Sequence, residues 1–423
     1  MRIVMMTNTY LPHVSGVAQS VARFVAAYQQ CGHDTLVMAP TYEGQPEYED
    51  HVVRIPAIQH FSGSDFSIVL PMPRFLSKTL HEFDPQIIHS HHPFLMGDTA
   101  LRTAAALNLP LVLTYHSMYE QYTHYVPLEA DNLARAVINL TTGYANLCDH
   151  VIAPSDYVGQ TLQQRGVTTP ITTIPTGVDT RQFASGNGES FRAANNIPED
   201  AYVIGHLGRL APEKNITLLT NAVAAFLKEH QDAHFIVTGS GPSEQEMQEI
   251  LETAGVGNRA HFTGPLSGAD LVDSYAAFDV FVFASKSETQ GMVLLEAMAA
   301  SVPVVALNAP PVDEIVAHNK NGCLVNTENA DALQEAINQL YKQDAQQKKQ
   351  MKLSAYETAA SWDTCRCAER ALTLYETILK EKQPRRSFNE HVWETLLHVI
   401  DEEWKIWTNR MNAMSTVVSK EDS

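Results

Sequence analysis

Two carboxylates stand eight residues apart where an apolar run leads into a helical pattern. Glu288 and Glu296 lie in the segment Ser287–Ala299, which follows the strand-like run Val280–Ala284. Eight helical residues span about 12 Å, roughly the distance from a sugar across a diphosphate to a ribose. Gly291 lets backbone approach a ligand closely, and amides at a helix start favour phosphate. The spacing indicates a nucleotide-sugar site, although a helix with one Glu at its start and another two turns on is also common by chance.

Two cations follow an earlier apolar run. Arg209 and Lys214 lie in the segment Gly208–Lys214, directly after the strand-like run Val203–Leu207. Arg supplies a planar fork and Lys a compact charge, so together they can clamp a diphosphate; the alternative is two solvated surface cations. The next run ends in Gly239–Pro242, which lacks the full dinucleotide fingerprint and so weighs against a dehydrogenase.

The histidines include a cluster at the ends of separate apolar runs, namely His89, His91, His92 and His116. A metal site is conceivable, but no Asp-x-Asp pair occurs anywhere in the chain. Arg209, Lys214 and helix N-termini can neutralise a leaving diphosphate instead. We therefore predict a site that requires no metal.

Composition excludes some classes of partner and favours one compartment. The 423 residues carry 29 basic against 48 acidic side chains, for a net charge of −19, which argues against nucleic acid and against wholesale attachment to anionic lipid. The five cysteines fit neither a zinc site nor a disulfide framework, so we expect free thiols in a reducing cytoplasm. The start of the chain does not resemble a signal peptide, and no apolar stretch reaches the ~20 residues that span a bilayer. We expect a cytoplasmic protein, or one bound to a membrane from the cytoplasmic side.

The chain alternates short apolar runs with helical patterns, which is typical of parallel sheets covered on both faces. The first set of predicted strands comprises residues 3–6, 35–39, 87–90, 111–115 and 150–153. The second set comprises residues 203–207, 234–238, 260–263, 280–284 and 302–306. We predict an α/β protein with two Rossmann-like, doubly wound domains, residues 1–180 and 181–362, facing each other across a cleft. The segment Phe183–Pro198, with Gly186 and Gly188, is predicted to be a linker or surface loop.

A helical tail is predicted over residues 383–423, where Trp393, Trp404 and Trp407 recur with other apolar residues at helical spacing. Such a helix could dock on the body of the protein, pair with a second copy, or lie in a membrane interface, which Trp prefers. Intervening acidic residues weigh against binding to anionic lipid.

Taken in order, these motifs resemble the retaining GT-B glycosyltransferases of the large family four, from Met1 to about Lys382. The resemblance implies that Arg209 and Lys214 hold the donor diphosphate, Glu296 binds the donor ribose and Glu288 binds the transferred hexose. It also implies donor contacts from Gly16, Gly208, Gly239, Gly291, Met292 and Val293. Residues 363–382 would form a helix that crosses back to complete the first domain.

A closer resemblance, mainly in the acceptor half, is to the diacylglycerol glucosyltransferases, in the segments Thr114–Tyr125, His91–Gly97, Pro175–Asp179 and Glu288–Gly291. That resemblance implies transfer of glucose from UDP-glucose to diacylglycerol at a membrane surface. The acceptor-side residues would be His91, His92, His116, Tyr119 and Tyr122. Many members of this group carry a strongly basic first domain, whereas residues 1–180 of this chain are acidic overall.

The expected reaction retains the anomeric configuration. Arg209 and Lys214 stabilise the departing diphosphate, Glu288 binds the hexose, and His116 lies near the reacting centre. A donor phosphate oxygen takes the acceptor proton, so the enzyme supplies no nucleophile and no tightly bound cofactor. The alternatives are the same chemistry on a soluble sugar or small metabolite, and a catalytically silent GT-B binding protein. The hexose, the nucleotide base and the oligomeric state stay open at this point.

Overall fold

The computed structural model describes residues 1–13, 15–58, 68–69, 73–120 and 130–381. The predicted tail of residues 383–423 and Tyr122, which was predicted to lie on the acceptor side, fall outside these ranges. The chain divides into two compact units. Among the described residues, unit 1 comprises residues 1–176 and 367–381, and unit 2 comprises residues 177–366.

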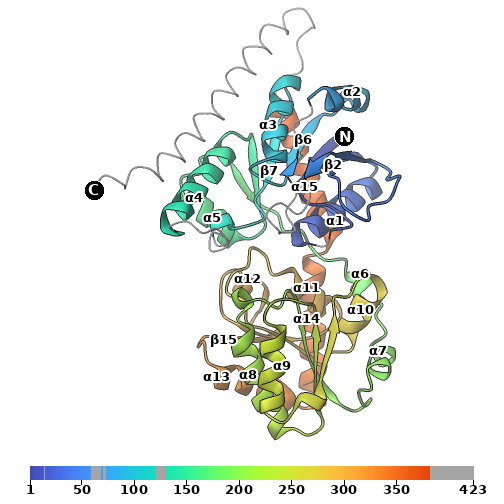
Figure 1. Ribbon diagram of the computed structural model, residues 1–423, viewed down its shortest axis with the longest axis vertical. Helices are drawn as coiled ribbons and strands as arrows, with labels where there is room; N and C mark the ends of the chain where they lie inside the picture. The colour runs from blue at the N-terminus through green and yellow to red at the C-terminus, as the bar shows by residue number, and fades with distance from the viewer. Residues whose placement is uncertain (14, 59–67, 70–72, 121–129, 382–423) are drawn as a thin grey trace, which may run out of the picture. The chain divides into compact units, whose positions relative to one another are not determined.

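Unit 1 is built on a parallel sheet of seven strands among the described residues, in the order β3-β2-β1-β6-β7-β8-β9 (Figure 1). The strands are β1 (Arg2–Met6), β2 (Asp34–Pro40), β3 (Val52–Ile55), β6 (Ile87–Ser90), β7 (Leu111–Thr114), β8 (His150–Ala153) and β9 (Ile171–Thr173). A short antiparallel pair, β4 (Ala57–Ile58) and β5 (Ile68–Val69), lies apart from this sheet. The strand order reverses between β1 and β6, and open α/β sheets bind ligands outside the carboxyl ends of the strands at such a switch point.

Helices cover both faces of this sheet. They are α1 (Gly16–Gln30), α2 (Pro73–Phe83), α3 (Met96–Leu107), α4 (Ala130–Asn146), α5 (Asp156–Gln164) and α15 (Thr364–Glu381). Buried residues of α3 and α5 share one core with β6 and β7, and buried residues of α1 and α15 share the other with β1 and β2. The buried positions of α15 recur every three or four residues, from Cys367 and Ala368 to Tyr375 and Ile378. This apolar stripe attaches the last helix to unit 1.

Unit 2 contains a second parallel sheet, with six strands in its described residues and the order β12-β11-β10-β13-β14-β15. The strands are β10 (Tyr202–Leu207), β11 (Ala233–Thr238), β12 (Ala260–Gly264), β13 (Val280–Phe283), β14 (Val304–Leu307) and β15 (Gly322–Val325). Helical segments are α6 (Thr180–Phe183), α7 (Gly188–Ala194), η3 (Pro212–Lys214), α8 (Ile216–Glu229), α9 (Glu244–Thr253), η4 (Gly257–Arg259), α10 (Gly268–Ala276), α11 (Met292–Ala299), α12 (Val312–Ile315), α13 (Ala330–Tyr341) and α14 (Ala345–Ser361). The switch point of this sheet lies between β10 and β13.

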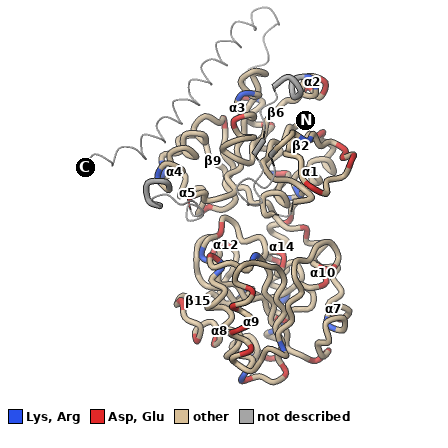
Figure 2. The backbone as a smooth tube through the Cα atoms, in the orientation of Figure 1, with Lys and Arg blue, Asp and Glu red and all other residues tan. Residues whose placement is uncertain are grey.

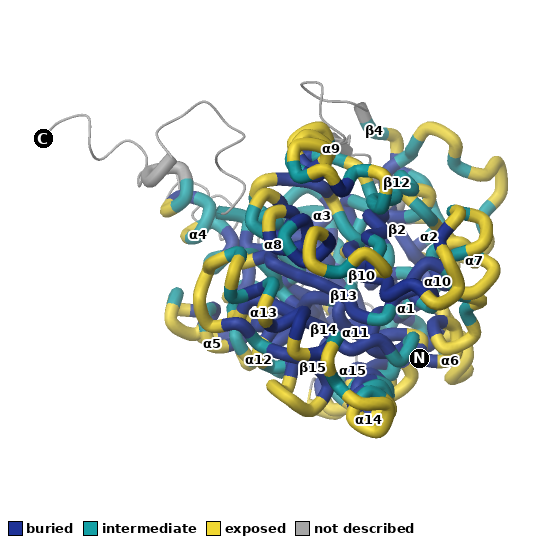
Figure 3. Tube along the Cα trace, turned by 90° about the horizontal axis from the view of Figure 1, so that it is seen from below, coloured by how far each residue is buried: buried dark blue, intermediate teal, exposed yellow. Residues whose placement is uncertain are grey.

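The strands of unit 2 are buried on both faces, which explains their nearly continuous apolar runs. Val280 and Val282 of β13 pack into the core with α8, α9 and α13. Phe281 and Phe283 of the same strand pack into the opposite core with α10, α11 and α14. Figure 3 shows β10, β13 and β14 as buried segments with exposed loops around them.

The prediction of a linker over Phe183–Pro198 is wrong, because residues 188–194 form α7. The Asn187 side chain caps this helix by accepting a hydrogen bond from the Ser190 amide at 3.0 Å. The glycines serve close packing against α10, since a Cβ at Gly186 or Gly188 would lie 2.6 Å or 2.2 Å from a backbone oxygen of that helix. Glycine thus permits two helices to meet here.

Charged residues of both signs are interspersed along the backbone of each unit (Figure 2). Across the ranges that the structure covers, no helix combines the length and the apolar character needed to cross a bilayer.

Candidate active site

The loops after β10 and β11 in unit 2 are joined by backbone contacts. The Gly208 amide donates to the Thr238 carbonyl at 3.0 Å, and the Leu210 amide donates to the Ser240 carbonyl at 3.0 Å. A Cβ at Gly239 would lie 1.9 Å from the Gly208 oxygen, so this glycine is needed for packing between the loops. At Gly208 the backbone has φ +153° and an added Cβ would meet open space. Gly208 therefore leaves room for a ligand, whereas Gly239 supports the loop beneath it.

Lys214 and Glu288 meet across the switch point of unit 2. The Lys214 Nζ donates to Glu288 Oε1 at 2.6 Å, and both side chains are mostly buried, at 24% and 16% exposed. Lys214 ends η3 after β10, and Glu288 lies in the loop after β13. The structure thus brings together two residues that lie 74 positions apart in the sequence. A diphosphate and a sugar hydroxyl placed here would each meet one member of this ion pair.

Arg209, in the loop between β10 and η3, is exposed. Among the described residues its guanidinium makes no hydrogen bond or ion pair, so all of its donors face solvent. Such an Arg can close on a phosphate without breaking a contact within the described part of the protein.

Helix α11 and its N-cap carry four more of the predicted donor residues. Gly291 is its N-cap, with a left-handed backbone (φ +74°) and no side chain to cap the amides of the first turn. Met292 and Val293 in that turn are half-buried, and Glu296 is buried at 7% exposed. The start of α11 therefore presents backbone amides and a positive dipole end, which suit phosphate.

Two buried polar atoms beneath these loops were missed from the sequence. His206 Nε2 and Ser285 Oγ, near the ends of β10 and β13, have no hydrogen-bond partner within the described part of the chain. Burial lowers the pKa of His206 to about 4. The hydrogen bond with the Val282 carbonyl raises this pKa, and the nearby charge of Lys214 lowers it further. Buried polar atoms are nearly always hydrogen-bonded. His206 Nε2 and Ser285 Oγ are therefore candidate contacts for a ligand or an ordered water.

The histidine cluster lies in unit 1, near the carboxyl ends of β6 and β7. His91 Nδ1 and His116 Nε2 are 2.9 Å apart and share a hydrogen bond. The His89 and His91 rings have centroids 4.2 Å apart. His92 Nδ1 accepts a hydrogen bond from the Asn8 amide at 3.1 Å, which fixes the His92 ring beside the end of β1.

The four clustered histidines have lowered pKa values, which favour the neutral form at pH 7. Burial lowers the pKa of His89 and of His92 to about 3. Burial and then the neighbouring histidines hold the pKa of His91 well below its ordinary value. Desolvation also lowers the pKa of the half-buried His116. A neutral imidazole can donate or accept a hydrogen bond at a substrate hydroxyl.

Both ring nitrogens of His89 are engaged. Nε2 lies 2.7 Å from Thr114 Oγ1, and Nδ1 lies 2.6 Å from the Tyr375 hydroxyl of α15. His89 therefore packs against His91 and has no ring nitrogen left to bind a ligand. Within the described residues, no three His, Cys, Asp or Glu side chains form a group that could hold a metal ion.

The structure places the remaining predicted residues as follows. Gly16 is exposed in the first turn of α1, a helix that Ser15 caps by accepting from the Ala18 amide at 3.2 Å. Tyr119 packs edge-on against Phe94, with ring centroids 4.9 Å apart, and belongs to the margin of a hydrophobic core.

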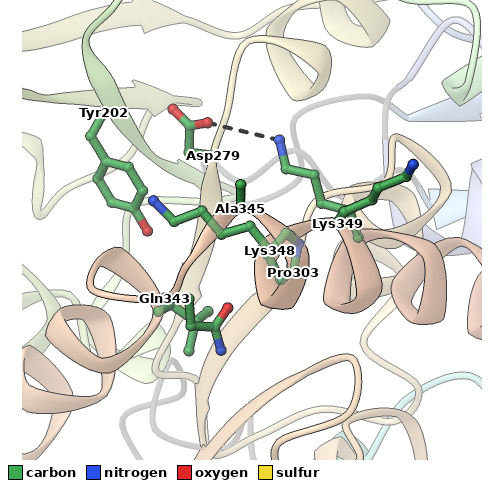
Figure 4. A pocket seen from close by; sticks show the side chains of 9 residues that line it. Tyr202, Asp279, Pro303, Gln343, Ala345, Lys348 and Lys349 are labelled. Atoms are coloured by element: carbon green, nitrogen blue, oxygen red, sulfur yellow. Dashed lines mark ion pairs between the residues drawn. The ribbon is translucent and has the colours of Figure 1, made fainter.

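A separate pocket of about 390 Å³ opens at the amino ends of β10, β13 and β14, the edge opposite Lys214 and Glu288. Figure 4 shows lysines of α14 around it. Lys348 Nζ lies 5.6 Å from the centroids of the Tyr202 and Tyr341 rings, and Lys352 Nζ lies 3.9 Å from Asp279. Two of the lysines are thus held by groups of the protein, which distinguishes them from Arg209.

Comparison with known proteins identifies the class. Residues 14–182 match the family described as Glycosyltransferase Family 4, and residues 187–358 match Glycosyl transferases group 1. An alpha-monoglucosyldiacylglycerol synthase of Streptococcus pneumoniae is 31% identical over 80% of this chain and 78% of that protein. The chain belongs to the group 1, family four glycosyltransferases, which have the GT-B fold.

Another relative is named for a different sugar, mannose. A GDP-mannose-dependent alpha-mannosyltransferase of Corynebacterium glutamicum is 30% identical over 77% of this chain and 76% of that protein. Among solved structures, HepE of Anabaena in complex with UDP has a TM-score of 0.71 at 22% identity, covering 89% of this chain and all of that one. That likeness concerns the fold, and it agrees with the predicted pair of Rossmann-like domains.

Proposed function

We propose that this protein is a retaining glycosyltransferase that moves glucose from UDP-glucose to diacylglycerol at the cytoplasmic face of a membrane. The observation that carries the donor half is the Lys214–Glu288 contact at the switch point of unit 2, beside the N-terminus of α11. The lipid acceptor and glucose are supported by the relatives named alpha-monoglucosyldiacylglycerol synthase, at 31% and 30% identity.

In this proposal the donor diphosphate lies against the start of α11. Arg209 and Lys214 neutralise the charge that grows on the diphosphate as its bond to the sugar breaks. Glu288 holds the hexose through its hydroxyls, and Glu296 of α11 accepts hydrogen bonds from the ribose. No metal is required, because the two cations and the helix dipole supply the positive charge.

On the acceptor side, neutral His116 contacts the hexose or the attacking hydroxyl, and His91 fixes its ring. The acceptor hydroxyl attacks from the face that the diphosphate leaves, and a donor phosphate oxygen takes its proton. This order of events retains the anomeric configuration without an enzyme nucleophile. Exclusion of water protects the donor from hydrolysis.

The direct test is transfer from radiolabelled UDP-glucose to mixed micelles with and without diacylglycerol, with products separated by polarity. UDP-galactose and GDP-mannose are offered in parallel reactions, because mannosyltransferases are about equally similar relatives. We expect a labelled glycolipid from UDP-glucose, its loss in Arg209→Ala, and normal turnover in the control Lys349→Ala, which removes an exposed lysine of α14.

Other outcomes separate the parts of the proposal. Glycolipid formed only from GDP-mannose would overturn the donor and leave the acceptor in place. Free glucose without glycolipid would overturn the lipid acceptor and favour a soluble one. No transfer or hydrolysis with any of the three donors would favour a catalytically silent binding protein.

A further inference from the structure

A buried tyrosine contacts the carboxylate that we assign to the donor ribose. Tyr275 lies on α10, and its hydroxyl donates a hydrogen bond to Glu296 Oε2 at 2.9 Å. Tyr275 is fully buried and Glu296 is 7% exposed. Nothing in the spacing of the sequence motifs indicates this contact, because the two residues lie on different helices.

The tyrosine ring is itself held in place by aromatic neighbours. Its centroid lies 5.4 Å from that of Phe183 in an edge-to-face arrangement, and 5.8 Å and 6.0 Å from those of Phe278 and Phe281. These contacts come from α6, from the segment between α10 and β13, and from β13. Because the ring cannot turn without disturbing this core, its hydroxyl is a fixed donor.

A fixed donor matters for a carboxylate that must accept two hydrogen bonds from neighbouring hydroxyls. Glu has three side-chain torsions, and the last one, which sets the plane of the carboxylate, is soft. The Tyr275 hydroxyl takes up one acceptor position of Oε2 and so restrains that plane. A group held in its binding geometry loses less entropy when a ligand arrives.

We propose that Tyr275 is a positioning residue for nucleotide recognition, which orients Glu296 toward the 2′- and 3′-hydroxyls of the donor ribose and thereby favours ribonucleoside over 2′-deoxyribonucleoside diphosphates. This inference rests on the proposed function, since it takes Glu296 as the ribose contact. Tyr275 acts through Glu296 and need not touch the substrate.

The test uses Tyr275→Phe, which keeps the ring and removes only the hydroxyl. The matched control is Tyr341→Phe, because the Tyr341 hydroxyl also donates to a carboxylate of unit 2, Asp232 Oδ2 at 2.9 Å, at the edge of the sheet away from the donor loops. Affinities for UDP and 2′-deoxy-UDP are measured by calorimetry on the full-length protein, together with kcat and KM for transfer.

We expect Tyr275→Phe to weaken UDP binding about tenfold and 2′-deoxy-UDP binding about twofold, so that the preference for ribose shrinks about fivefold. KM for the donor should rise by about the factor by which UDP affinity falls, and kcat should stay within about twofold of the wild-type value. Tyr341→Phe should leave the preference unchanged. A Tyr275→Phe protein with a lowered melting temperature but the wild-type UDP to 2′-deoxy-UDP ratio would reduce the role of Tyr275 to core packing and overturn the proposal.

A double-mutant cycle tests the coupling between Tyr275 and Glu296 directly. Glu296→Gln keeps the shape of the side chain, and adding Tyr275→Phe to it should cost no further UDP affinity, because the positioned group is already changed. Independent, additive losses would contradict the coupling. Wild-type protein that binds neither UDP nor GDP would refute the proposed function, whereas wild-type binding with an unchanged ratio in the variant refutes the positioning role alone.

Discussion

Lowering the pH from 7 to 5 should destabilise unit 1 through its buried histidines. His89 and His92 have a pKa of about 3 in the folded protein, against an ordinary value of 6.5. Below pH 6.5 the unfolded chain binds protons that the folded protein does not. The stabilisation is therefore complete above the unfolded pKa and is lost as the pH falls toward the folded pKa.

The magnitude follows from the size of that window. At pH 5 each histidine is about 1.5 pH units below its unfolded pKa, which corresponds to about 2 kcal/mol. His89 and His92 together remove about 4 kcal/mol from the free energy of unfolding, and His91, whose pKa lies well below its ordinary value, adds to this. Since domains are typically stable by about 5–15 kcal/mol, unit 1 should lose a large share of its stability.

The assay is urea unfolding followed by circular dichroism at pH 7 and pH 5. His92→Asn keeps an acceptor near the position of Nδ1 for the Asn8 amide but cannot titrate. Its loss of stability between the two pH values should be smaller than that of the wild type by about 2 kcal/mol. The exposed control His51→Asn should behave as the wild type. An equal pH dependence in His92→Asn and wild type would refute the argument that burial keeps His92 neutral.

Two further substitutions test the packing that supports the site. Gly239→Ala would put a Cβ 1.9 Å from the Gly208 oxygen, so it should destabilise unit 2 strongly. The control is Gly255→Ala, where φ is also positive but the added Cβ meets open space, so that the cost should be only about 1–2 kcal/mol. Equal melting temperatures for the two variants would contradict this prediction. Asn8→Ala removes the buried side chain that accepts from the Met96 amide at 2.9 Å and donates to the Phe94 carbonyl at 3.1 Å, and should cost about 2–3 kcal/mol in urea unfolding. The exposed Asn146→Ala should cost less, and a reversed order would show that the Asn8 contacts contribute little.

The sequence predicts the fold well where strands are buried on both faces. Runs such as residues 3–6 and 280–284 coincide with β1 and β13 to within one residue at one end, because a core on both faces of the sheet favours apolar residues at successive positions. β9 (Ile171–Thr173) was not predicted, because its half-buried residues lack such a run. Helix α7 was mistaken for a loop because glycines at a close helix contact have the same composition as glycines in a turn.

The candidate site could be predicted only as motifs at strand ends. That Gly208–Lys214 and Ser287–Glu296 converge follows from parallel strands ending at one edge of a sheet. Contacts between side chains far apart in the chain could not be predicted this way. Examples are the Tyr275 hydroxyl on Glu296 and the Tyr375 hydroxyl on His89, 286 positions away. Such contacts depend on how helices pack, which spacing in the sequence does not encode.

The most direct measurement of the central claim is UDP binding by calorimetry to the wild type, Lys214→Met and Lys348→Met. Both lysines belong to unit 2, but Lys214 contacts Glu288 at the carboxyl edge of the sheet and Lys348 lies over aromatic rings at the opposite edge. We predict that Lys214→Met weakens UDP binding by tenfold or more and that Lys348→Met changes it less than about twofold. Loss of UDP binding in Lys348→Met with full binding in Lys214→Met would place the nucleotide in the pocket of Figure 4 and contradict the account.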